Sequence, residues 1–218
     1  MLKLRLDPGG EPVRLLCLGA HPDDIEIGCG GLLLRLFGEA QGIEVRWIVF
    51  SGTEERRAEA EASARRFLGA LGGGTATVRV LGFRDGFFPS EIAGIKETFE
   101  ALKRDYRPTL ILTHCRDDLH QDHRTVAELT FNTFRDHLIW EYEIPKYDGD
   151  FGNPNLYVPL ELSLCRAKTT AILETFPSQR PRAWFTAETF MALMRLRGIG
   201  CNSPSGYAEA FYCRKAVV

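Results

Sequence analysis

The strongest constraint on the fold is a regular alternation of apolar runs with helix-forming stretches over residues 13–138. The apolar runs are 13–20, 45–50, 77–83 and 110–114, and the helix-forming stretches are 30–40, 54–71, 90–105 and 123–138. Continuous apolar runs are typical of strands buried on both faces, and strands that alternate with helices of this length form a parallel sheet. We therefore predict an α/β fold in which helices cover both faces of a mostly parallel sheet.

The second half of the chain is less regular. Residues 145–159 are rich in Pro, Gly, Asn and Asp and are predicted to form a long ordered loop. Helices are expected near 163–175 and 186–197, and the partly alternating tail 208–218 predicts a late strand at a sheet edge. A single domain over residues 1–218 is the simplest interpretation, and a domain boundary near the 145–159 loop is the alternative.

Most of the histidines fall at one edge of the predicted sheet. In open α/β sheets, ligands bind outside the carboxyl ends of the strands. The predicted loops at that edge are 20–30, 51–56, 82–90 and 114–123. The chain has five His, and those within these loops are His21, His114, His120 and His123. Structural histidines have no reason to gather there, so the clustering indicates an active site at the carboxyl ends of the strands.

Two short motifs in these loops have the spacing of metal ligands. His21 and Asp24 are three residues apart in HPDD, and His120 and His123 have the same spacing in HQDH. In a turn or at a helix start, this spacing lets both side chains point at one centre. HPDD alone would favour a tight turn, and HQDH alone a solvated helix start. Together they favour a zinc site with three protein ligands and an open position, and the spacing leaves open which of His120 and His123 is the ligand.

The neighbouring residues could supply the other groups that metal-dependent hydrolysis needs. Zinc lowers the pKa of water from about 15.7 to about 7, which makes hydroxide available at neutral pH. Asp23, beside Asp24, is the natural general base, and the histidine that does not bind metal can assist the oxyanion or the leaving group. Asp122 can orient that histidine through a hydrogen bond. A two-metal phosphoesterase would need more carboxylates than these loops contain.

Composition excludes several other classes of protein. With 27 Lys and Arg against 29 Asp and Glu, the net charge of -2 disfavours a dedicated nucleic-acid-binding protein. No apolar run reaches the ~18–20 residues of a membrane span, and residues 1–14 contain charges and glycines where a signal peptide has its apolar core. The six Cys form no Cys-x-x-Cys pair, so we expect reduced, packed thiols in a cytoplasmic protein.

At AHPDDIEIGCGG (20–31) and HQDHR (120–124) the sequence resembles the PIG-L/LmbE-like family of zinc-dependent N-deacetylases, as does SGYAEAF (205–211). The resemblance implies a Rossmann-like fold and one zinc ion per chain, or another divalent metal in its place. It implies hydrolysis of an N-acetyl group from an N-acetylglucosamine-type or related amino sugar, by a homo-oligomer that is a trimer or a hexamer. The alternatives are an amidase on another small amide, such as a thiol conjugate or a lipid-linked sugar, and a non-catalytic small-molecule binding protein.

The resemblance also implies a role for each residue of the two motifs. The implied zinc ligands are His21, Asp24 and His123. Asp23 would be the general base, and His120 would stabilise the oxyanion or protonate the amine. Asp122 would set the charge state of His120.

Residues outside the two motifs are implied to bind substrate. Arg56 with Glu59 fits the family's Arg-x-x-Glu at the start of the second helix, but Arg57 lies at the more usual distance from the end of that helix. The choice between the two arginines therefore stays open, and a solvated helix face with mixed charges is the alternative. Asp85, in FRDG, resembles an acidic residue that binds sugar hydroxyls.

Overall fold

The structure, a computed structural model, describes residues 12–39 and 42–217. Residues 1–11, on which most of the expectation about an export signal rests, lie outside this part of the chain. Among the described residues, no helix combines the length and the apolar character needed to cross a membrane.

The described residues form one seven-stranded sheet with helices packed against it. The strands are β1 Arg14–Gly19, β2 Glu44–Ser51, β3 Thr75–Phe83, β4 Leu110–His114, β5 Ile139–Tyr142, β6 Leu156–Pro159 and β7 Ala208–Tyr212. The helices are α1 Asp24–Glu39, α2 Glu54–Leu68, α3 Ile92–Asp105, α4 Gln121–Thr133, α5 Leu162–Thr175 and α6 Ala187–Gly200. Short 3-10 helices lie at η1 Phe88–Ser90 and η2 Pro177–Gln179.

The strand order is β3-β2-β1-β4-β5-β7-β6. The strands β1 to β5 pair with one another in parallel, whereas β7 is antiparallel to both β5 and β6. The predicted α/β fold with a mostly parallel sheet is therefore confirmed.

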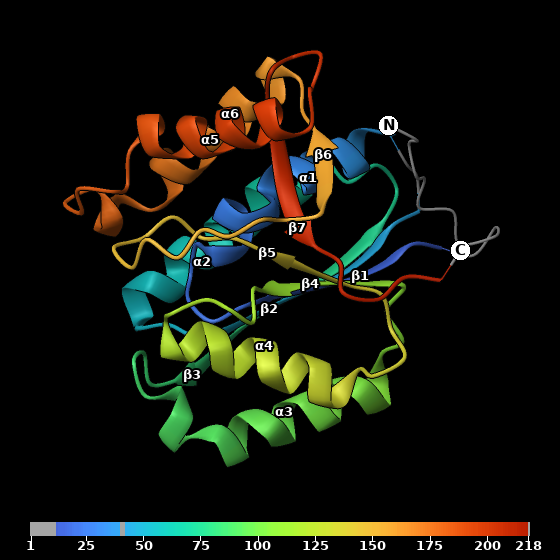
Figure 1. Cartoon of the computed structure of the whole chain (residues 1–218). Helices are drawn as coiled ribbons and strands as arrows, with labels where there is room; N and C mark the ends of the chain where they lie inside the picture. The colour runs from blue at the N-terminus through green and yellow to red at the C-terminus, as the bar shows by residue number, and fades with distance from the viewer. Residues whose placement is uncertain (1–11, 40–41, 218) are drawn as a thin grey trace.

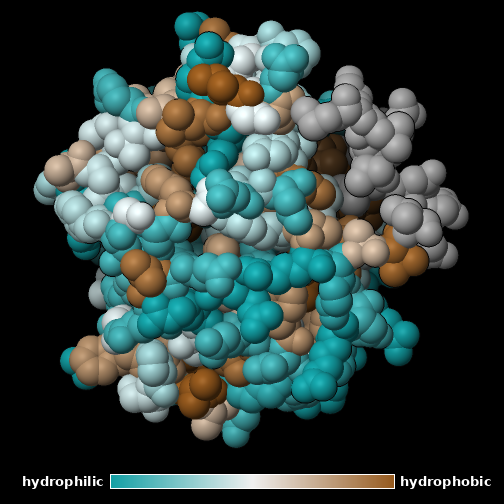
Figure 2. All heavy atoms as spheres, in the orientation of Figure 1, coloured by the Kyte–Doolittle hydropathy of each residue, from teal (hydrophilic) through white to brown (hydrophobic). Residues whose placement is uncertain are grey.

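Helices lie on both faces of the sheet (Figure 1). The helices α1, α2, α5 and α6 cover one face, and α3 and α4 cover the other. Leu15 and Cys17 of β1 join the first hydrophobic cluster, while Leu16 and Leu18 join the second. A strand with both faces buried needs apolar side chains at every position, which is why β1 reads as a continuous apolar run. On the outside, the surface over α4 is mostly hydrophilic (Figure 2).

The topology places the two histidine motifs next to each other. β1 pairs with β2 on one side and with β4 on the other, so the loops after β1 and β4 start from neighbouring strands. Ligands of open α/β sheets bind where the chain connections diverge in this way. HPDD follows β1, and HQDH forms the N-cap and the first turn of α4, the helix that follows β4.

The structure corrects the start of the first helix. α1 begins at Asp24 and not at residue 30, so HPDD is a short turn that leads directly into the helix. The glycines at 28–31 lower helix propensity, but a Cβ at Gly28 would collide with the Tyr142 ring and one at Gly31 with Leu160. Close packing therefore explains why glycine is tolerated inside this helix.

The second half of the chain contains two strands that the sequence did not predict, β5 and β6, and one whose position in the sheet was predicted wrongly, β7. α4 ends at Thr133 and not at residue 138, and β5 follows it. The predicted 145–159 loop ends in β6, which forms the edge of the sheet. The late strand β7 is confirmed, but it lies between β5 and β6, so its predicted edge position is wrong.

Candidate active site

Three side chains from two loops meet at the carboxyl edge of β1 and β4. His21 Nδ1 lies 3.1 Å from His123 Nε2 and 3.5 Å from Asp24 Oδ2, and Asp24 Oδ1 lies 3.6 Å from His123 Nε2. Ligand atoms around a tetrahedral zinc ion, at about 2.0–2.1 Å from the metal, are about 3.3 Å apart. His21, Asp24 and His123, here named the His-Asp-His cluster, therefore fit a zinc ion in both donor type and spacing.

In both histidines of the His-Asp-His cluster, the outer ring nitrogen, which is the one that points away from the cluster, lies beside a carboxylate. His21 Nε2 lies 3.2 Å from Asp122 Oδ2 and 3.1 Å from Asp85 Oδ1, and His123 Nδ1 lies 2.9 Å from Asp118 Oδ2. A carboxylate that accepts the outer N–H leaves the lone pair of the inner nitrogen free for a metal. Both histidines thus have the hydrogen-bond partners expected of metal ligands.

His114 and His120 border the cluster, but one ring nitrogen of each already accepts a hydrogen bond from a backbone N–H. His114 Nε2 accepts a hydrogen bond from the Ala20 N–H at 2.9 Å, and His120 Nδ1 accepts one from the Asp122 N–H at 3.2 Å. A neutral imidazole that accepts at one nitrogen carries its proton on the other. Two other groups of possible metal ligands, one with His120 and one with His114, also have their ligand atoms within 4.8 Å of one another. The His-Asp-His cluster is favoured over them because its histidine nitrogens accept no hydrogen bond from the backbone of the described residues.

The charges around the cluster favour a bound cation. Burial lowers the pKa of His21, but hydrogen bonds to carboxylates, led by Asp122, outweigh it and raise the pKa well above its ordinary value. Burial and the charge of His114 lower the pKa of His123 to about 3, so this imidazole is neutral near pH 7. Metal ligands need neutral imidazoles and ionised carboxylates, and a metal ion would supply the positive charge that the carboxylates around His21 attract.

The Asp23 carboxylate pairs with Arg56, whereas that of its neighbour Asp24 faces the clustered histidines. Its φ angle of 130° is rare for a residue with a side chain, and such conformations concentrate at functional sites. The carboxylate lies 3.0 Å from Arg56 Nη2 and is buried. Burial raises the pKa of Asp23 to about 7, against the opposing charge of Arg56. A carboxyl group with a pKa near neutrality is suited to accept and release a proton.

The two arginines at the start of α2 have different partners. Arg56 forms ion pairs with Asp23 at 3.0 Å and with Glu59 at 3.1 Å. Arg57 donates instead to backbone carbonyls of Val80 and Leu81 in β3. Of the two arginines left open by the sequence, Arg56 is therefore the one beside the predicted base.

Asp122 orients a different histidine from the one expected. Its carboxylate accepts hydrogen bonds from the backbone of Gly86 at 2.6 Å and Phe88 at 3.1 Å, and it lies against His21. Only its backbone N–H contacts His120, which caps the N-terminus of α4. The expectation that the Asp122 side chain hydrogen-bonds His120 is thus wrong, because the loop after β3 holds this carboxylate on the His21 side.

Asp85 lies at the rim of the site. Its carboxylate contacts His21, yet its side chain is 76% exposed. Contact with His21 lowers its pKa despite partial burial, which favours an ionised carboxylate facing solvent.

Sequence reasoning missed two charged residues behind the cluster. Asp118 contacts His123, and Lys146 Nζ lies 3.1 Å from the same Asp118 oxygen. Asp118 shares the loop of HQDH, and an aspartate so close to a ligand histidine is a signal that could have found it. Lys146 follows the unpredicted strand β5, so no pattern in the sequence pointed to it.

Comparison with known proteins identifies the family. The family model described as PIG-L, GlcNAc-PI de-N-acetylase, matches residues 16–134, which include both histidine motifs. The chain belongs to the PIG-L family, and it is a deacetylase enzyme. This result disfavours the non-catalytic binding protein that was kept as an alternative.

Solved structures share the fold at low sequence identity. The conserved protein TT1542 from Thermus thermophilus has 24% identity and a TM-score of 0.70, with 94% of this chain and 95% of that chain covered. The N,N'-diacetylchitobiose deacetylase from Pyrococcus horikoshii has 21% identity and a TM-score of 0.67, with 94% and 84% covered. GalB, the 4-carboxy-2-hydroxymuconate hydratase from Pseudomonas putida KT2440, has 16% identity and a TM-score of 0.66, with 94% and 98% covered. Since a hydratase shares the fold, the fold alone does not identify the reaction.

Proposed function

We propose that this protein is a zinc-dependent N-deacetylase that removes the acetyl group from an N-acetylglucosamine-type or related amino sugar. The proposed zinc ligands are His21, Asp24 and His123. The observation that carries the proposal is the 3.1–3.6 Å separation of the two histidine nitrogens from each other and from the nearer Asp24 oxygen of each, on the edge of the sheet where α/β folds bind ligands. The family description and the named activity of the chitobiose deacetylase support the reaction and the substrate class.

Zinc at this site would polarise the amide carbonyl and make hydroxide available near neutral pH. Asp23 accepts the proton of the attacking water and delivers it to the amine nitrogen as the C–N bond breaks. Arg56 holds the Asp23 carboxylate in place through their 3.0 Å ion pair. Acetate and a free amine are the products.

His120 acts in this proposal as a hydrogen-bond donor. Because its Nδ1 accepts from the Asp122 N–H, a neutral His120 carries its proton on Nε2. Its ring centre lies 4.9 Å from that of His21 and 4.6 Å from that of His123, so it borders the proposed metal position. From there Nε2–H would donate to the carbonyl oxygen as negative charge develops on it.

At the rim, Asp85 is proposed to accept hydrogen bonds from sugar hydroxyls. It is the exposed carboxylate of the site, and it lies 3.1 Å from His21 Nε2. An ionised carboxylate accepts only, which matches the donor hydroxyls of a sugar. Lipid-linked sugars and thiol conjugates remain substrates to be compared in the same assay.

The test combines zinc binding with acetate release. Wild-type protein is depleted of metal, titrated with zinc and assayed on a panel of N-acetylated sugars and other small amides. Asp23→Ala should bind zinc as the wild type does and lose about 100- to 10,000-fold in rate. His123→Ala should lose zinc binding, whereas His137→Ala, which changes a histidine outside the site, should keep both properties. An Asp23→Ala variant with wild-type acetate release would contradict the assignment of the base.

A further inference from the structure

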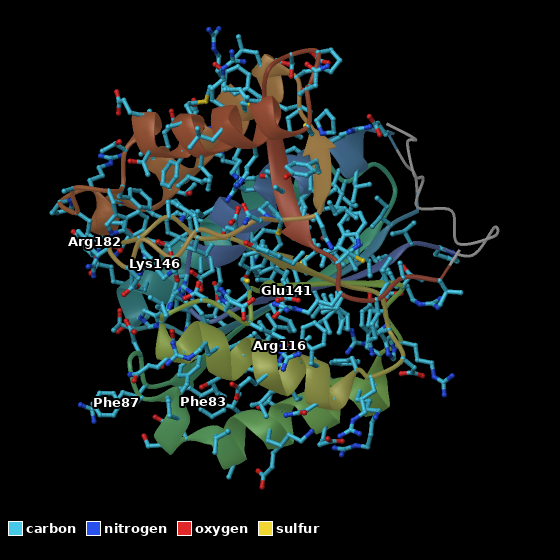
Figure 3. The ribbon with its side chains drawn as sticks, viewed as in Figure 1. Phe83, Phe87, Arg116, Glu141, Lys146 and Arg182 are labelled. Carbon is cyan, nitrogen blue, oxygen red and sulfur yellow. The ribbon has the colours of Figure 1, made fainter. Side chains whose placement is uncertain are left out.

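Lys146 is a buried cation on the segment that follows β5. Its side chain is 8% exposed, and its Nζ lies 3.1 Å from Asp118 Oδ2 and 2.6 Å from Asp150 Oδ2. Figure 3 shows Lys146 on this segment, close to the N-terminal end of α4. Lysine is rarely buried unless it is paired, so its position between two carboxylates calls for an explanation.

Asp118 connects this cation to both histidines of the HQDH motif. Its Oδ2 contacts His123 Nδ1 at 2.9 Å, and its Oδ1 accepts a hydrogen bond from the His120 backbone N–H at 2.7 Å. The Asp118 side chain is 3% exposed, so water does not replace these partners. A displacement of Asp118 would therefore move His123.

The Asp118 carboxylate, whose charge Lys146 balances, decides which nitrogen of His123 carries the proton. The Lys146 ammonium forms an ion pair with Asp118 Oδ2, and a carboxylate only accepts hydrogen bonds, so Oδ2 is the acceptor of the contact with His123. The proton of the His123 contact then lies on Nδ1, and Nε2 presents its lone pair to His21 Nδ1 and Asp24. This is the tautomer that a metal ligand needs, because a protonated Nε2 cannot bind a cation.

The same lysine joins two loops of the site. Asp150 accepts from Lys146 and also from the Leu119 backbone N–H at 2.7 Å. Leu119 belongs to the loop between β4 and α4, whereas Lys146 and Asp150 belong to the segment between β5 and β6. The Lys146–Asp150 pair therefore ties the second segment to the loop that contains His120.

We propose that Lys146 is a positioning residue for the metal centre, which acts through Asp118 to fix His123 with its Nε2 facing the metal. The inference rests on the proposed function only in taking His21, Asp24 and His123 as the metal ligands. It does not depend on which amide is the substrate. Loss of the direct partner of a metal-bound histidine, here Asp118, typically costs about 10- to 100-fold in metal affinity, and Lys146 acts one contact further out.

The test is the zinc affinity of metal-depleted protein, measured by competition with a chelator. Lys146→Met should weaken zinc binding by up to about 10-fold, which is less than the loss in Asp118→Asn, and Lys146→Arg, which keeps a cation with several donors, should recover most of the loss. Asp150→Asn loosens the tie between the loops but keeps the Lys146–Asp118 contact, so it should change zinc affinity less than about threefold. Lys96→Met is the control, because it also removes a paired lysine, one that pairs with Glu100 on α3 away from the site. It should leave zinc affinity unchanged.

A purely structural role for Lys146 gives a different pattern. It would lower the melting temperature of the metal-free Lys146→Met protein and leave zinc affinity unchanged, and that result overturns the inference. Equal losses of zinc affinity in Lys146→Met and Asp150→Asn overturn it as well, because general loosening of the loops would then be the cause.

A double-variant comparison shows whether the effect passes through Asp118. Zinc affinity of Lys146→Met/Asp118→Asn should match that of Asp118→Asn alone, whereas additive losses contradict the inference. If Lys146→Met does not fold, Lys146→Gln gives the same comparison with a polar side chain. Failure of the proposed function is distinguishable, because it appears as absence of stoichiometric zinc or of acetate release in the wild type.

Discussion

Glu209, in the SGYAEAF segment, should be one of the residues whose loss destabilises this fold most. Its carboxylate accepts hydrogen bonds from the backbone of Gly31 and Leu32 in α1, each at 2.7 Å, and pairs with Lys168 at 2.7 Å. Lys168 also donates to the Ile27 carbonyl of α1 at 2.6 Å. The pair thus connects α5 and β7 to the backbone of the helix that begins at Asp24.

Glu209→Ala should lower the free energy of unfolding because it leaves the buried Lys168 ammonium without its carboxylate partner. The Lys168 side chain is 3% exposed, so its ammonium would stay buried beside the Ile27 carbonyl without the carboxylate that balances its charge. Removing one member of a buried ion pair costs about 3–5 kcal/mol, a large part of the about 5–15 kcal/mol that stabilises a typical protein. With a urea m-value of about 2–3 kcal/mol/M, the unfolding midpoint should fall by about 1–2.5 M.

Urea unfolding followed by tryptophan fluorescence and circular dichroism measures this change. Glu39→Ala on the same helix is the control, because the Arg35–Glu39 pair is exposed and should contribute less than about 1 kcal/mol. Lys168→Met/Glu209→Gln should be more stable than Glu209→Ala, since it leaves no unpaired buried charge and keeps an acceptor for α1. Equal midpoints for Glu209→Ala and Glu39→Ala would refute the reasoning.

Three further predictions concern the base, the packing of α1 and the thiols. Arg56→Ala should lower kcat for deacetylation about 10- to 100-fold with zinc affinity unchanged, because Arg56 holds Asp23 and no metal ligand; steady-state kinetics and zinc titration check this. Gly28→Ala should destabilise the protein by about 1–3 kcal/mol in urea unfolding, since the added methyl group would collide with the Tyr142 ring. Thiol titration of the native protein near pH 8 should show Cys213 reacting first, because every other cysteine is buried, and all six should react after denaturation.

The part of the fold that the sequence predicts best is the part where burial is complete. β1 is apolar at every position after Arg14 because the two hydrophobic clusters cover both of its faces, so a strand was evident without any long-range information. β5 is a strand of only four residues that follows the end of α4 closely, and its pattern does not separate it from a helix. The position of β7 inside the sheet depends on pairing with β6, and no local pattern encodes that partner.

The residues of the site likewise divide into those that local sequence patterns predict and those that depend on the tertiary structure. His21, Asp24 and His123 lie in short motifs whose spacing and position after two strands were legible, and the structure brings their ligand atoms together. The contacts that support them join loops far apart in sequence. Lys146 meets Asp118 only because β5 lies beside β4, so their contact depends on the tertiary structure. The pairing of Asp122 with His21 was missed for the same reason.

The most direct test of the central claim is acetate release from metal-depleted protein during a zinc titration, with bound zinc measured in the same samples. The proposed site predicts that activity rises with bound zinc and reaches a plateau at about one zinc per chain. Asp24→Ala, which removes one proposed ligand, should show neither tight zinc binding nor acetate release. Full acetate release by the metal-depleted wild type, or an undiminished zinc stoichiometry in Asp24→Ala, would contradict a zinc-dependent deacetylase built on this cluster.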